Sequence, residues 1–166
     1  MIHFLDFEAS SLSDESYPIE AGWASLDLVT GIITSESMLI TPVVAWTDWN
    51  PASQAIHNIE RQTLYTDGYT VCAVAQRMSM ILGGMVLCDG GAYDEHWNQR
   101  LYYAAGEMCP YTLRDYWHEV ALRMNDHELD SLKQFMVFER FREPRPHRAK
   151  EDAEFLAKLY RDCVTF

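Results

Sequence analysis

The chain has 166 residues, of which 48% are hydrophobic and 23% charged, with a formal net charge of -12. These values are typical of a globular protein, exclude a largely disordered chain, and predict a single domain over residues 1–166. The acidic balance argues against non-specific binding to nucleic acid or to an anionic membrane, because phosphate-rich surfaces attract net positive charge.

The amino-terminal third predicts an antiparallel meander of three strands, because extended apolar runs alternate there with short turns. The predicted strands cover residues 2–8, 21–29 and 32–40. Helical spacing of apolar residues predicts helices over 71–82, 92–105, 126–138 and 148–163, with a further helix start at Asn50-Pro51, a buried strand over 85–88 and an ambiguous segment over 111–124. This order predicts a mixed α/β sheet flanked by helices.

Four carboxylates occupy positions that the hydrophobic pattern would give to apolar side chains or to the sheet. Asp6 and Glu8 are two residues apart in the first extended segment, so both point from the same face of a strand. Asp94 and Asp152 lie on the apolar stripes of two predicted helices. A buried charge is costly unless it is paired or binds a metal ion, and oxygen ligands from separate elements suit Mg²⁺ or Mn²⁺.

Each helical acid also has a structural interpretation. Asp94 would stabilise the amino terminus of its helix through the macrodipole, and Asp152 would pair with the nearby Arg148. The four acids together are harder to explain in this way, because the first 57 residues contain no Lys or Arg to compensate Asp6 and Glu8.

A basic segment precedes the last predicted helix. Residues 140–150 contain five of the 13 Lys and Arg residues, and two prolines keep the part before His147 out of a regular helix. The segment is either a solvated loop that balances neighbouring acids or a loop that contacts phosphate groups. Histidine is the residue type that most often serves as a general base acting on water, so His147 is the candidate base of this segment.

Three short motifs follow one another along the chain. An Asp-x-Glu pair stands at residues 6–8, a Tyr-Asp pair ends residues 89–94, and His-x4-Asp spans residues 147–152. In this order the motifs resemble those of the DEDDh group of 3′–5′ exonucleases, which have a ribonuclease H-like fold. Asp89 is an alternative ligand in the second motif, but Asp94 is preferred because it follows a tyrosine and lies on the helix stripe.

The resemblance implies a ribonuclease H-like mixed sheet, with an antiparallel meander followed by parallel strands and flanking helices. It also implies a hydrolase, a nuclease that releases nucleoside 5′-monophosphates from the 3′ end of nucleic acid with two Mg²⁺ or Mn²⁺ ions. Asp6, Glu8, Asp94 and Asp152 would be the catalytic, metal-binding carboxylates, and His147 would be the general base.

The same resemblance implies contacts with the terminal nucleotide. Residues after the first motif and around a His-x-Ile sequence would pack against this nucleotide, with Leu12 and Ile59 as apolar clamps on the last base. Arginines of the basic segment would contact phosphate groups. These substrate-binding candidates are Ala9, Leu12, His57, Ile59, Arg145 and Arg148.

The expected partner is a single-stranded or short 3′ end of RNA or DNA, because a chain of this length leaves no room for a separate nucleic-acid-binding domain. Two alternatives stay open: a phosphohydrolase of the same fold that acts on small nucleotides or dinucleotides, and a non-catalytic nucleic-acid-binding module. Aromatic residues offer surface for a homodimer interface. The cysteines show no CxxC spacing and no apolar run approaches the roughly 20 residues that cross a bilayer, so we expect a cytoplasmic protein without membrane contact.

Overall fold

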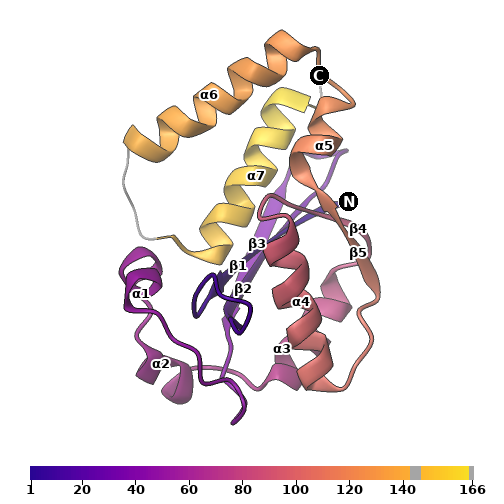
Figure 1. The fold of residues 1–166 in the computed structure, drawn as a ribbon. Helices are drawn as coiled ribbons and strands as arrows, with labels where there is room; N and C mark the ends of the chain where they lie inside the picture. The colour runs from indigo at the N-terminus through magenta and orange to yellow at the C-terminus, as the bar shows by residue number, and fades with distance from the viewer. Residues whose placement is uncertain (143–146, 165–166) are drawn as a thin grey trace.

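The computed structural model describes residues 1–142 and 147–164, apart from the side chains of residues 138–142 and 163–164. The described strands form one sheet in the order β3-β2-β1-β4-β5 (Figure 1). β1 pairs antiparallel with β2, β2 pairs antiparallel with β3, and β4 runs parallel to β1 and β5. The strands are β1 (Ile2–Ala9), β2 (Pro18–Leu26), β3 (Ile33–Leu39), β4 (Gly84–Cys88) and β5 (Tyr111–Asp115). The predicted fold class, a meander followed by parallel strands, is therefore confirmed.

The second strand is displaced from its predicted range of 21–29. β2 begins at Pro18, which a strand tolerates as its first residue, and it ends at Leu26. The earlier end has a local cause, because the Asp27 side chain accepts a hydrogen bond from the Val29 N–H at 2.8 Å and turns the chain.

The predicted helices lie close to their expected positions, and a short helix over Arg61–Thr66 was not predicted. The ambiguous segment over 111–124 divides into β5 and a short helix, and the helix predicted over 126–138 continues to Arg142. The helices are α1 (Pro51–His57), α2 (Arg61–Thr66), α3 (Val71–Ile81), α4 (Ala92–Ala105), α5 (Tyr116–Ala121), α6 (Asp126–Arg142) and α7 (Ala149–Val164). Within the described ranges, every helix is too short or too polar to span a membrane.

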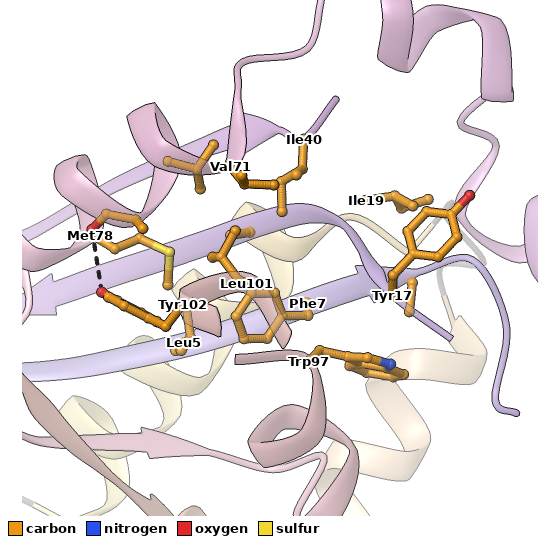
Figure 2. Close-up of a cluster of buried hydrophobic side chains, with 14 of the residues drawn as sticks. Leu5, Phe7, Tyr17, Ile19, Ile40, Val71, Met78, Trp97, Leu101 and Tyr102 are labelled. Carbon is orange, nitrogen blue, oxygen red and sulfur yellow. Dashed lines mark hydrogen bonds between the residues drawn. The ribbon is translucent and has the colours of Figure 1, made fainter. Parts of the chain in front are cut away.

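The two faces of the sheet carry separate hydrophobic clusters. Neighbouring residues of a strand point to opposite faces, so Leu5 and Phe7 pack with residues of α3 and α4 such as Met78 and Leu101 (Figure 2). Phe4 points the other way and packs in the cluster that contains residues of α5, α6 and α7. By the same alternation, the even-numbered acids of β1 lie on the face that α7 covers.

Candidate active site

The centre of the candidate site is the carboxyl-terminal half of β1. Asp6 and Glu8 follow Phe4 on the face of the sheet toward α7, and the strand register places them opposite Gly22 and Glu20 of β2. Asp6 is partly buried and Glu8 is 9% exposed. The face therefore changes from apolar to acidic along the strand.

The first turn of α7 lies directly against β2 at Gly22. A Cβ atom at Gly22 would stand 2.1 Å from the Ala149 carbonyl carbon and 2.2 Å from the Lys150 nitrogen, far inside van der Waals contact. Only glycine therefore permits this approach of helix and strand. The approach carries Asp152, in the first turn of α7, toward the acids of β1.

The predicted acid and base of the third motif meet at this point. The His147 Nδ1 lies 3.5 Å from the Asp152 Oδ2, and the imidazole side chain is 47% exposed. Ligand atoms of Glu8, His147 and Asp152 all lie within 4.8 Å of one another. The His147 N–H also donates to the carbonyl oxygen of Ile56 at 3.2 Å, which ties this residue to the end of α1.

The fourth acid comes from the start of α4, which follows the end of β4. Asp94 is 1% exposed, and its Oδ2 accepts a hydrogen bond from the Gly90 N–H at 2.9 Å. A Cβ atom at Gly90 would stand 2.7 Å from the same oxygen, so a side chain there would displace the Asp94 carboxylate. Asp89, the sequence alternative to Asp94, is only partly buried.

Burial and mutual repulsion perturb the acids strongly. Burial, followed by the charge of Asp94 and of Glu8, raises the pKa of Asp6 well above its usual range. Burial and then the charge of Asp152 raise the pKa of Glu8 to about 8, and burial raises the pKa of Asp94 despite its bond from Gly90. Such a set of crowded carboxylate oxygens fits a hard divalent cation, whose charge would remove the repulsion.

A pocket of about 130 Å³ adjoins the acids at Glu8. Its walls come from the end of β1 and the segment that follows, from α1 and from α4. Two of its apolar side chains, Leu12 and Ile56, are more than half exposed and so present free apolar surface. The lining residues are Phe7, Glu8, Ala9, Ser11, Leu12, Ser53, Ile56, His57 and Trp97.

His57 presents a buried hydrogen-bond donor at this pocket. The side chain is 2% exposed, and its Nδ1 accepts a hydrogen bond from the Ile59 N–H at 3.0 Å. Burial lowers the pKa of His57 to about 4, so the ring is neutral and carries its proton on Nε2. This Nε2 has no hydrogen-bond partner among the described residues.

The other predicted substrate contacts are placed differently. Ile59 is 4% exposed and belongs to the hydrophobic core, whereas Ile56 of α1 lines the pocket. Arg148 donates from Nε and Nη2 to the carboxylate of Glu20. Arg145 lies outside the described residues.

Sequence reasoning missed several residues of the site. Ser53, Ile56 and Trp97 line the pocket, and Glu20 binds Arg148 beside the acids. The only sequence signal was the charge of Glu20 within an otherwise apolar strand, since a buried charge requires a partner.

Comparison with known proteins finds similarity at the level of structure. No protein-family model matches the chain, and no curated protein does either. A full-length 3′-exonuclease is 14% identical, with a TM-score of 0.71 over 98% of this chain and 61% of its own. E. coli exonuclease I in complex with a dT13 oligonucleotide is 16% identical, with a TM-score of 0.58 over 74% of this chain and 29% of its own.

A product-bound exonuclease I is similar to the same extent, with 15% identity, a TM-score of 0.58 and coverage of 70% of this chain and 30% of its own. The chain thus spans less than a third of the exonuclease I structures and about three fifths of the 3′-exonuclease. At these identities the similarity establishes the architecture. The chain therefore has the mixed-sheet, ribonuclease H-like fold that these exonucleases share.

Proposed function

We propose that this chain is a metal-dependent 3′–5′ exonuclease of the DEDDh type that acts on single-stranded or short nucleic acid. The observation that carries the proposal is the meeting of Asp6, Glu8, Asp94 and Asp152, from three separate elements, beside His147 and a pocket. Carboxylates with raised pKa values in a concave site are typical of catalytic centres. The exonuclease neighbours support the same reading.

The four acids would hold two Mg²⁺ or Mn²⁺ ions. When bound, such ions lower the pKa of an attacking water and stabilise the charge that develops on the phosphate. The acids are suited to this role because their ionised forms repel one another in the metal-free protein.

His147 would accept the proton of the attacking water. Its Nδ1 faces Asp152, so a proton on Nδ1 is held by the carboxylate and leaves Nε2 free as the base. The half-exposed imidazole can reach water at the mouth of the site. The backbone bond to Ile56 fixes this base relative to the pocket wall.

The pocket would receive the 3′-terminal nucleoside. Leu12 and Ile56 offer apolar surface to a base. The buried Nε2–H of His57, which has no partner among the described residues, would donate to a substrate oxygen that reaches it. The volume is well below the roughly 300–1,000 Å³ of common ligand sites. It therefore has room for about one ring system, such as the terminal base, and not for a duplex.

A small-nucleotide or dinucleotide phosphohydrolase is the second candidate. Two observations favour it: the net charge is -12, and Arg148, a predicted phosphate contact, is engaged by Glu20. Both features weaken attraction for a long phosphate backbone. The two candidates differ in their dependence on substrate length.

One digestion series tests these functions. Single-stranded RNA and DNA, from dinucleotides to long strands, carry a 5′ label and are incubated with Mn²⁺, with Mg²⁺ or with chelator. The parent should shorten strands from the 3′ end with either metal, and Asp6→Ala should not. Cleavage of dinucleotides alone would favour the phosphohydrolase. No cleavage of any of these substrates would refute the exonuclease and leave a hydrolase of smaller nucleotides or, if metal also fails to bind, the binding module.

A further inference from the structure

Glu20 is a buried acid that the proposed chemistry does not use. It lies in β2 and is 1% exposed, yet its two oxygens are fully engaged. They accept hydrogen bonds from Arg148 Nε at 2.9 Å, Arg148 Nη2 at 2.7 Å, the Ala149 N–H at 3.2 Å and the Ser37 Oγ at 3.0 Å. Glu20 therefore connects β2 and β3 to the start of α7.

The position of Glu20 is unfavourable by itself. The strand register places it directly opposite Glu8, and like charges across a strand pair destabilise a sheet. Burial increases this cost. A bidentate arginine and a helix amino-terminal N–H compensate it, because both carry positive charge toward the carboxylate.

The contacts of Glu20 lie between the two residues of the third motif. Arg148 immediately follows His147, and Ala149 begins the helix whose first turn contains Asp152. Gly22, two residues along β2, removes the side chain that would hold this turn away from the sheet. Glu20 supplies the attraction and Gly22 supplies the space.

We propose that Glu20 is a positioning residue: by clamping Arg148 and the Ala149 N–H, it holds His147 and Asp152 against Asp6 and Glu8. This inference rests on the proposed function only for its effect on catalysis. Because Glu20 is 1% exposed and both its oxygens are engaged, it would touch neither substrate nor the attacking water. Its effect is large because displacement of catalytic groups by about 1 Å can lower a rate by about 100-fold.

The chain offers a matched control for this clamp. Glu36 of β3 binds Arg77 of α3 in the same bidentate way, with the Arg77 Nη2 at 2.8 Å and Nε at 3.1 Å. This pair joins the sheet to α3 instead of α7. Glu36→Gln therefore removes a charge pair of the same bidentate geometry, although a more exposed one, and leaves the start of α7 intact.

The experiment compares Glu20→Gln, Arg148→Gln, the double variant and Glu36→Gln on the cleaved substrate. We expect Glu20→Gln to lower kcat by about 10- to 100-fold with little change in KM, and Glu36→Gln to retain the parent's kcat. The double variant should lose no more than the worse single variant, because both break one unit. Parental kcat in Glu20→Gln, an additive double variant, or an equal loss in Glu36→Gln would overturn the clamp.

Amide hydrogen exchange gives a readout that does not depend on activity. Residues 148–152 should exchange faster in Glu20→Gln than in the parent, and no faster in Glu36→Gln. Unchanged exchange would refute the clamp even if the enzyme were active. If the parent cleaves nothing, the proposed function fails, while this exchange comparison still decides whether Glu20 holds α7.

Discussion

Replacing Glu8 by Gln should stabilise the metal-free protein at alkaline pH while abolishing hydrolysis. Burial, with the charges of Asp152 and Glu20, raises the pKa of Glu8 from 4.5 to about 8. When folding raises the pKa of an acid, the folded protein prefers the protonated carboxyl group. The stability that this preference allows is fully present below the unfolded pKa and is lost as the pH rises through the folded pKa. The metal-free parent should therefore lose stability as the pH rises from 4.5 to about 8.

The magnitude follows from the size of the shift. One pKa unit corresponds to about 1.4 kcal/mol, so the ionisation of Glu8 lowers the free energy of unfolding by up to about 4 kcal/mol near pH 8. Glu8→Gln cannot ionise and avoids this loss. The variant should therefore match the parent near pH 5 and exceed it increasingly toward pH 8.

The assay is urea denaturation in chelator across this pH range, with Glu36→Gln as the control. Glu36 is 39% exposed and paired with Arg77, so its replacement should give no gain that grows with pH. Saturating Mn²⁺ should then stabilise the parent, because it binds the folded state, but should stabilise Glu8→Gln much less. A Glu8→Gln variant that is less stable than the parent throughout would refute the electrostatic reasoning.

Four further substitutions test the site. Asp94→Asn should lower hydrolysis by about 100-fold or more, and Asp89→Asn by less than about 10-fold, because Asp94 is fully buried and its charge raises the pKa of Asp6 more than that of Asp89 does. The reverse order in steady-state assays would make Asp89 the ligand. Gly90→Ala would place a Cβ 2.7 Å from the Asp94 Oδ2 and should weaken Mn²⁺ binding by about 10-fold in calorimetry, whereas parental affinity would show that the carboxylate has room to move. His57→Phe should raise KM by about 10-fold through loss of the Nε2–H donor. Because the pKa of His57 is about 4, the ratio of the variant's KM to the parent's should stay constant between neutral and mildly acidic pH; a ratio that changes near neutrality would contradict this.

The elements of the fold could be predicted because their signals are local. Apolar spacing places α3, α4 and α7 within a residue or so of their observed bounds. The start of α1 was also predictable, since Asn50 caps the helix with a hydrogen bond to the Ala52 N–H and Pro51 opens it. The end of β2 depends on the side chain of Asp27, whose turn is a weaker signal than the apolar residues beyond it.

The acids of the candidate site were also visible in the sequence. Asp6 and Glu8 lie on one face of an apolar strand, and Asp94 and Asp152 lie on the apolar stripes of helices. Each therefore places a charge where the hydrophobic pattern predicts an apolar side chain. Their convergence could not be derived from spacing alone, and it rested on the motif resemblance. In the structure the charges of the other three acids all raise the pKa of Asp6.

The contacts that position these acids could not be predicted. Arg148 has an acid four residues further along the chain, so local reasoning pairs it with Asp152, but its partner Glu20 is 128 residues away. The roles of Gly22 and Gly90 depend on atoms that approach only in three dimensions. The pocket depends on the helical register of α1, which turns Ile56 toward it while Ile59, beyond the helix, enters the core.

One face of the sheet thus carries two kinds of buried carboxylate with opposite effects on stability. Glu20 accepts four hydrogen bonds, two of them from Arg148, so its neutralisation should destabilise the metal-free protein. Glu8 lies opposite Glu20 in the β1–β2 pair, and burial and its acidic neighbours raise its pKa. Its neutralisation should therefore stabilise the same protein near pH 8. Both substitutions should lower activity. Stability and activity measured together therefore distinguish the two roles. A positioning acid such as Glu20 should lose both when it is neutralised, whereas a proposed metal ligand such as Glu8 should lose activity and gain stability.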